Sequence, residues 1–248
     1  MVGVRMLNAG EQGLVVEFGN AINPDINARV HQTAYMLRVQ MAEEIIEVVP
    51  TYRSLLVYFD PLRIKRPILV KRIEEILLNM DWSAAKKEAK VVTIPVCYGS
   101  EFGPDLDFVA AHNGLSIDEV VNIHTSTPYL VYMLGFTPGF PYLGGMSERI
   151  AAPRLQQPRT KIPAGSVGIA DSQTGLYPIE SPGGWRLIGR TPIKAFNSGI
   201  EESFLFSAGN YLQFVSVSSD EYYVIQKEVD LGSYTPLTSI FGGGDKQV

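Results

Sequence analysis

The stretch Gly135–Gly145, "GFTPGFPYLGG", decides how the larger part of this chain can fold. Four glycines and two prolines stand within its eleven residues. Proline removes a backbone donor and fixes φ, and glycine loses much conformational freedom when it is ordered, so neither a helix interior nor a central strand accommodates the stretch. It predicts tight loops of fixed shape.

The same composition continues as far as residue 192. Residues 135–192 hold 10 of the 23 glycines and 8 of the 16 prolines of the chain. Many short strands separated by glycine and proline are typical of a closed sheet, so we expect residues 89–240 to form a mainly β, barrel-like domain. The expected strands are Val91–Val96, "PYLVYML" from Pro128, "SVGIA" from Ser166, "WRLIG" from Trp185, "NYLQFVSV" from Asn210 and "EYYVIQKEV" from Glu221.

Two short helices are expected between the first of these strands and Pro128. The second is marked by Ser116 with Glu119 three residues later, which is a capping-box pattern. Leu115 and Val120 occupy the positions of a hydrophobic staple around it.

Residues 1–88 alternate strand and helix patterns. Asn23 as N-cap and Pro24 at the first helical position predict one helix, and the apolar spacing within Pro67–Met80 predicts a second. This order predicts a small α+β domain, a ferredoxin-like sandwich with its helices on one face of the sheet. The expected strands are "GLVVEFG" from Gly13, "EIIEVVP" from Glu44 and "SLLVYFDP" from Ser54.

Two further segments are expected to lack regular structure. The polar stretch Asp81–Lys90 predicts a linker between the domains, and residues 241–248 predict a flexible tail.

Composition and charge exclude several classes of protein. Apolar residues make up 46% and charged residues 19%, as in a globular chain, and no apolar run approaches the roughly 18 residues of a membrane span. A net charge of −5 argues against general affinity for nucleic acid. The single cysteine, Cys97, lies in a strand-like run and predicts a buried thiol in a reducing compartment. Without a signal-peptide pattern near the first residue, we expect a cytoplasmic protein.

Basic residues gather in the loop-rich segment. Seven lysines and arginines but only two acids, Asp171 and Glu180, lie between Arg149 and Lys194. Either these cations pair with distant acids in the fold, or they belong to a site built for an anion.

The loops also carry polar and aromatic groups suited to binding. Rigid loops on a barrel are places where binding residues tend to lie, although the same composition fits barrel corners without a ligand. The candidate binding residues are Arg190, Gln173, Thr174, Tyr177, Arg159, Lys161, Gly183, Gly184 and Phe140. Strand alternation predicts that Arg186, Ile188 and Arg190 share one face, opposite Trp185, Leu187 and Gly189.

Common catalytic motifs are absent from the sequence. No phosphate-binding loop or dinucleotide fingerprint occurs, and the three histidines lack a second ligand at metal-binding spacing, so we expect no metal site. Ser166 does not stand in a G-x-S-x-G nucleophile elbow. No catalytic residue is assigned.

Three segments carry a family resemblance. "GFTPGFPYLGGM", "PRLQQPRTKIPAGSVGIADSQTGLYPIESPGGWRLIGRTP" and "EVDLGSYTP" resemble the family of 5-oxoprolinase B subunits, also called allophanate hydrolase subunit 1 or Kip-type inhibitors of sporulation histidine kinases. The resemblance is dense over Leu134–Phe196. It departs at Asp171, where we associate glycine with the family, and in "SAGNYLQF", where we expect a Pro-Gly-Asp turn.

The resemblance implies a fold and a function. It implies a small α/β domain followed by a cyclophilin-like barrel, and a chain that works in a hetero-oligomer with homologous C and separate A subunits to open 5-oxoproline to glutamate with ATP. ATP would be shared with, or bound by, the partner, and this chain alone would be inactive. In the same family, some members instead bind a sensor histidine kinase and block its autophosphorylation, and the sequence leaves that alternative open.

Overall fold

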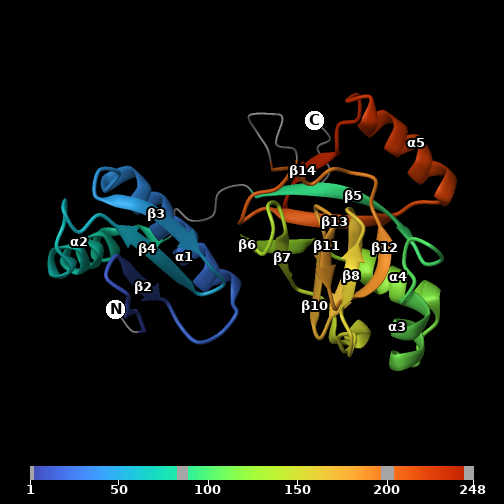
Figure 1. Ribbon diagram of the computed structural model, residues 1–248, viewed down its shortest axis with the longest axis horizontal. Helices are drawn as coiled ribbons and strands as arrows, with labels where there is room; N and C mark the ends of the chain where they lie inside the picture. The colour runs from blue at the N-terminus through green and yellow to red at the C-terminus, as the bar shows by residue number, and fades with distance from the viewer. Residues whose placement is uncertain (1–2, 83–88, 197–203, 243–248) are drawn as a thin grey trace. The chain divides into compact units, whose positions relative to one another are not determined.

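A computed structural model describes residues 3–82, 89–196 and 204–242 and divides the chain into two compact units (Figure 1). The N-terminal unit is Met1–Lys87 and the C-terminal unit is Glu88–Val248. Most of the predicted linker Asp81–Lys90 and of the predicted tail 241–248 lies outside the described residues. No helix of the described chain combines the length and apolar character that crossing a membrane requires.

The N-terminal unit is an antiparallel sheet whose one face is covered by two helices. The strand order is β1-β2-β4-β3, and residues from both helices and from the sheet form one apolar core. The first strand was not predicted, and it occupies the sheet edge beside β2. The elements are β1 Arg5–Ala9, β2 Gly13–Glu17, α1 Pro24–Gln40, β3 Ile45–Pro50, β4 Ser54–Phe59 and α2 Arg66–Asn79.

Local signals in the sequence set the start of α1. The Asn23 side chain accepts hydrogen bonds from the backbone N–H groups of Asp25 and Ile26, at 2.8 and 3.3 Å, and Pro24 takes the first helical position. The predicted cap is therefore confirmed, because the side chain satisfies donors that have no partner within the helix.

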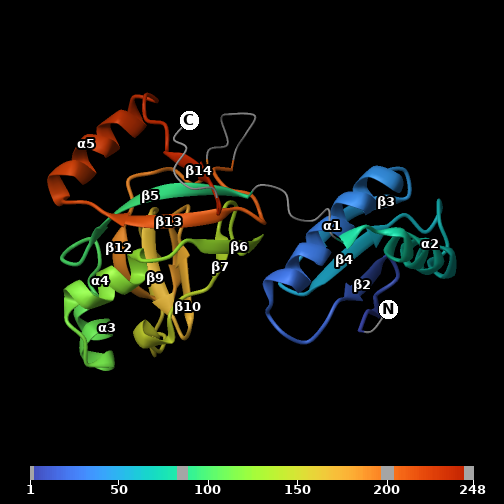
Figure 2. The same ribbon diagram turned by 180° about the vertical axis from the view of Figure 1, so that it is seen from behind.

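The C-terminal unit is a mainly β sheet that curls until it nearly closes (Figures 1 and 2). Its strand order is β10-β9-β12-β5-β13-β6-β7, with β14 beside β5, and β10 also lies against β7 at the other end of that order. The coarse prediction of a barrel-like β unit is thus confirmed, whereas the cyclophilin-like and ferredoxin-like assignments stay predictions. The strands are β5 Lys90–Tyr98, β6 Tyr129–Leu134, β7 Pro141–Gly144, β8 Arg159–Ile162, β9 Ser166–Ala170, β10 Gln173–Leu176, β11 Ser181–Gly183, β12 Arg186–Arg190, β13 Tyr211–Ser216 and β14 Thr238–Ile240.

Helices close parts of the barrel. The two predicted short helices are α3, Leu106–Asn113, and α4, Ile117–Thr125, which lie side by side, and Ser116 and Glu119 form the predicted capping box (Figures 1 and 2). The predicted strand "EYYVIQKEV" is wrong, because this stretch lies in helix α5, Ser219–Asp230. Its β-branched and aromatic residues suggested a strand, but Ser218 and Glu221 form a second capping box that starts a helix.

Pro95 lies in the middle of β5 without breaking the sheet. Two strands pair with the same side of β5. The pairing with β14 extends only as far as Val92 of β5, and the pairing with β12 begins at Cys97 of β5. Thr93 N–H, two residues before Pro95, points to that same side and donates to Leu237 O at 2.9 Å. The donor that proline lacks therefore falls in the gap between two neighbouring strands.

The segment Gly99–Asp105 is fastened to a bulge in β12. Gly99 N–H donates to Ile188 O at 3.0 Å and Asp105 N–H donates to Leu187 O at 2.9 Å, while Leu187 N–H donates to Asp105 Oδ2 at 2.7 Å. Gly103 makes the close approach possible, because a Cβ there would lie 2.0 Å from Ile188 O. The buried Asp105 carboxylate also pairs with Arg159, at 2.9 and 3.0 Å.

We expect Asp105→Ala to lower the free energy of unfolding by about 3 kcal/mol, because it leaves the Leu187 N–H and the half-buried Arg159 guanidinium without their acceptor. Urea denaturation followed by circular dichroism measures this loss. Asp107→Ala, at an exposed acid in the first turn of α3, which begins just after Asp105, is the control and should change stability little. Equal small effects in the two variants would show that Asp105 does not hold the segment.

Candidate functional site

The strands β10, β9 and β12 have two distinct faces. On the inner face, Leu176, Val167 and Ile169 join the main barrel core. On the outer face, Ala170 and Tyr177 join a separate cluster. The side chain at Gln173, directly opposite Ala170, lies on this outer face by strand alternation, and that at Thr174 lies on the inner one.

An aromatic cluster covers the outer face. We use this name for Phe140, Tyr142, Tyr177 and Trp185. The Phe140 ring lies edge-to-face on Tyr177 and Trp185, with ring centroids 5.5 and 5.8 Å apart. These are favourable geometries for aromatic pairs, and they hold segments together that are distant in sequence.

Two glycines leave the space in which the rings of Trp185 and Tyr177 pack against the strands. A Cβ at Gly175 would lie 2.8 Å from Trp185 Cζ3, and one at Gly183 would lie 2.5 Å from Tyr177 Oη. The predicted residues Phe140, Tyr177 and Gly183 are therefore brought together. Burial raises the pKa of Tyr177 to about 12, so its hydroxyl is a neutral donor at physiological pH.

Most cations of the basic segment have acidic partners. Arg154 lies 5.9 Å from the Trp185 ring and pairs with Asp171 at 3.3 Å, and the predicted binding residue Lys161 pairs with Glu180 at 3.0 Å. Arg159 pairs with Asp105, as described above. For Arg154, Lys161 and Arg159, the account in which these cations pair with acids of the fold therefore holds.

The two departures from the family pattern are turn positions. Asp171 adopts a φ of 53°, in the left-handed region that favours glycine and that Asp tolerates better than most residues. In "SAGNYLQF", Gly209 has a φ of 87° and Asn210 N–H donates to Ser207 O at 3.1 Å, so the turn keeps its glycine. Gly184, another predicted binding residue, accepts a backbone hydrogen bond from Leu155 at 2.7 Å.

Arg190 differs from Arg154, Arg159 and Lys161. Within the described residues it has no carboxylate at ion-pair distance, and its Nη2 donates only to Glu101 O, at 3.4 Å. Its guanidinium lies 5.8 Å from the Phe102 ring. The site prediction for Arg190 stays untested, but its charge is unpaired in this part of the structure.

The predicted shared face of Arg186 and Arg190 is wrong. Their partners on β9 are Ile169 and Ser166, which are three residues apart instead of four, because a bulge lies between Leu187 and Gly189. An extra residue on one strand reverses the alternation beyond it. Arg186 follows the inner face and contacts Phe108, whereas Arg190 follows the outer face.

Thr174, predicted to bind substrate, lies in a buried hydrogen-bonded chain. His124 Nε2 is 2.8 Å from Thr174 Oγ1, and His124 Nδ1 is 2.8 Å from the Tyr98 hydroxyl. Since Thr174 Oγ1 donates to Gly168 O at 3.2 Å, it accepts from His124 Nε2–H, and the Tyr98 hydroxyl donates to Nδ1. The chain is satisfied with a neutral histidine.

Sequence reasoning missed Asp105, His124 and Trp185 as residues that shape this site. Asp105 and His124 lie far from the loop-rich segment in sequence, and neither stands in a recognisable motif. Trp185 was named among the aromatic residues of the loop-rich segment but not as a binding residue, and its contacts with Phe140 and Tyr177 depend on the curl of the sheet.

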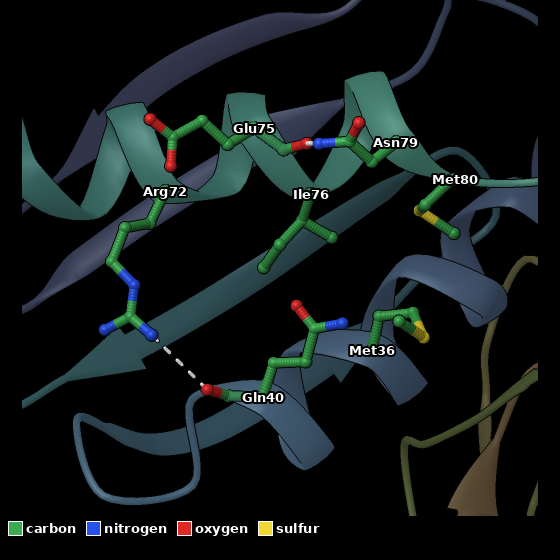
Figure 3. Close-up of a pocket in the computed structure, with 7 residues that line it drawn as sticks. All are labelled: Met36, Gln40, Arg72, Glu75, Ile76, Asn79 and Met80. Carbon is green, nitrogen blue, oxygen red and sulfur yellow. Dashed lines mark hydrogen bonds between the residues drawn. The ribbon is translucent and has the colours of Figure 1, made fainter.

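A hollow of about 340 Å³ lies elsewhere, between α1 and α2 of the N-terminal unit (Figure 3). None of the predicted binding residues lines it, and Arg72, its cation, already pairs with Glu44 and contacts Gln40 O at 3.4 Å. A cluster of three metal-ligating side chains is absent from residues 3–82, 89–196 and 204–242. The lining residues are Met36, Gln40, Arg72, Glu75, Ile76, Asn79 and Met80.

Burial should make His124 a source of acid lability. Desolvation lowers its pKa from 6.5 to about 3, so in acid the unfolded chain binds more protons than the folded one. The contribution of the buried neutral His124 to the free energy of unfolding is fully present above pH 6.5 and is lost as the pH falls towards 3. Between pH 7 and pH 5 we expect a loss of about 2 kcal/mol, measured by urea denaturation.

Two measurements isolate this effect. His124→Gln should abolish most of the pH dependence in that range, whereas His112→Gln, at an exposed histidine, should keep it. Nitrogen-15 NMR of the imidazole should show the Nε2–H tautomer persisting to pH 5. A His124 that titrates near 6.5 in the folded protein would contradict the assignment.

Known proteins resemble this chain over most of its length. The family described as carboxyltransferase domain, subdomain C and D, matches residues 4–206. A protein of Bacillus subtilis, named as the B subunit of 5-oxoprolinase, is 46% identical over 231 residues, which cover 88% of this chain and 95% of that protein. The Escherichia coli O157:H7 protein of the same name is 40% identical, covering 83% of this chain and 93% of that one.

A solved structure titled TTHA0988 is also similar, with a TM-score of 0.76 and 34% identity. The match covers 84% of this chain but only 41% of that longer one. The family match extends over both units and includes the whole outer face with its aromatic cluster. The chain therefore belongs to the carboxyltransferase domain family, subdomain C and D, and within it to the group of 5-oxoprolinase B subunits.

Proposed function

We propose that this chain is the B subunit of an ATP-dependent 5-oxoprolinase, which converts 5-oxoproline to glutamate together with its C and A subunits. The identity of 46% and 40% to proteins named as 5-oxoprolinase B subunits, over nearly their full lengths, is the observation that carries the proposal. Those relatives are named as enzyme subunits, which does not favour the alternative of a sensor-kinase inhibitor.

The outer face offers what such a substrate requires. 5-Oxoproline is a carboxylate on a lactam ring, so a cation should hold the carboxylate while donors polarise the amide oxygen. Arg190 supplies a guanidinium that has no ion pair within the described residues, and the aromatic cluster supplies an apolar wall with the protonated Tyr177 hydroxyl. Gln173 lies on the same face.

The site is half of a complete one. This chain has no phosphate-binding loop, so we place the ATP contacts largely on the partner. We assign no catalytic residue here. TTHA0988 is more than twice as long as its matched region, which fits a unit that works joined to further domains. With one buried cysteine, we place the assembly in the cytoplasm.

Purified alone, the chain should neither hydrolyse ATP nor consume 5-oxoproline. Co-purified with C and A subunits encoded by neighbouring genes, it should show 5-oxoproline-dependent release of phosphate and glutamate. Turnover by the isolated chain would overturn the half-site proposal. An assembled complex that ignores 5-oxoproline would overturn the proposed substrate.

Arg190→Ala should reduce turnover of the assembled enzyme by two orders of magnitude or more, since a charged hydrogen bond at a site contributes roughly 2–4 kcal/mol. The melting temperature should change little, because Arg190 makes only one long hydrogen bond in the described chain. Arg63→Ala, an exposed arginine of the N-terminal unit, is the control. Near-normal turnover in Arg190→Ala would remove Arg190 from the site.

A further inference from the structure

Two buried polar atoms on neighbouring strands lack a hydrogen-bond partner among the residues that the structure describes. They are Ser166 Oγ on β9 and Arg190 Nε on β12. Ser166 is fully buried, with 0% of its surface exposed. Such atoms are uncommon in folded proteins, because leaving a buried donor unpaired costs about 1–3 kcal/mol.

The two residues form a direct cross-strand pair. Ser166 stands opposite Arg190 in the antiparallel ladder of β9 and β12, so their side chains lie on the same, outer face. Directly opposed Cβ atoms in such a ladder are roughly 5 Å apart. One small group can therefore contact both unpaired atoms.

Apolar surface borders the pair on both sides. Leu187 on β12 and Trp185 just before that strand belong to the cluster over Ala170 and Tyr177. On the other side Arg190 stands opposite Cys97 of β5, which packs with Phe102 and Tyr222. A low-dielectric border strengthens any charge interaction formed at the pair.

The positive charge at the pair is not neutralised by the nearest acid. Glu101 offers Arg190 only its backbone oxygen, and its carboxylate instead accepts from the Tyr223 hydroxyl at 3.1 Å. The two unpaired atoms also share one chemical role. Arg190 Nε–H is a donor only, and the Ser166 hydroxyl has a proton to donate.

We propose that Ser166 and Arg190 together anchor the carboxylate of the ligand, with the Ser166 hydroxyl and Arg190 Nε–H donating to its oxygens. A carboxylate oxygen accepts from both donors and offsets the charge. That the ligand is 5-oxoproline rests on the proposed function.

The proposal gives Ser166 a signature that a structural serine would not have. Because its hydroxyl is unpaired in the free protein, Ser166→Ala should leave the melting temperature unchanged or slightly higher. In the assembled enzyme the same change should raise KM for 5-oxoproline about tenfold and alter kcat little, as expected for a lost ground-state hydrogen bond to a charged group. Ser181→Ala, at a buried serine whose hydroxyl already donates to Ile179 O, should leave KM unchanged.

NMR of the isolated chain tests the anchor without turnover. The Arg190 Nε–H resonance should move on titration with 5-oxoproline and with acetate, but not with pyrrolidin-2-one, which has the lactam ring and no carboxylate. Ser166→Ala should weaken both titrations. Arg190→Lys, which keeps the charge but lacks Nε–H, should raise KM in the assembled enzyme as Ser166→Ala does.

The outcomes separate this inference from the proposed function. If the assembled enzyme turns over 5-oxoproline and Ser166→Ala leaves KM unchanged, the anchor is wrong and the function stands. If the complex ignores 5-oxoproline but acetate still moves Arg190 in a Ser166-dependent way, the carboxylate anchor stands and the substrate is wrong. A response to inorganic phosphate alone, an equal response to pyrrolidin-2-one, or no response to either carboxylate would overturn the inference.

Discussion

Asp105 joins three segments that are distant in sequence, and the geometry of the outer face depends on it. Its carboxylate accepts from the Leu187 backbone at the β12 bulge and pairs with Arg159 at the start of β8. Without the Asp105 carboxylate, the bulge would leave a buried N–H unpaired. The two-stranded ribbon that β8 and β11 form with each other would also lose the ion pair that links Arg159 to Asp105. The bulge in turn decides that Arg190 lies on the outer face, and Trp185 lies beside that ribbon.

Local features of the fold were predictable because they depend on neighbouring residues. The caps at Asn23 and Ser116 and the β-branched run of β5 each follow from a few adjacent side chains. The helix α5 was misassigned for the opposite reason: its interior is rich in Tyr and Val, and only the Ser218–Glu221 box indicated a helix. Where propensity and capping disagreed, the cap and the burial of Tyr222 prevailed.

The site was predictable as a region but not as a geometry. Glycine and proline enrichment marked the segment in which the aromatic cluster lies, but much of that segment forms the short strands β7 to β12, and β7 lies within the stretch Gly135–Gly145 that was predicted as loops. Which side chains share a face depends on the register of β9 against β12, and one extra residue at the bulge moved Arg190 to the face opposite that of Arg186. Thr174 lies on the inner face by strand alternation, and its hydrogen-bond partner there is a histidine fifty residues away in sequence.

The two faces of the β10-β9-β12 sheet differ in how their polar groups are satisfied, and this difference indicates where another molecule is needed. On the inner face, Tyr98, His124, Thr174 and Gly168 form a closed chain of neutral hydrogen bonds that requires nothing further. On the outer face, the buried Ser166 hydroxyl and the Nε–H of Arg190 are left without acceptors among the described residues. The described chain leaves three other buried side-chain atoms unpaired, Gln32 Oε1, Arg66 Nε and Thr137 Oγ1. Ser166 and Arg190 differ from these because they stand directly opposite each other on paired strands, so a single acceptor from outside the chain would satisfy both.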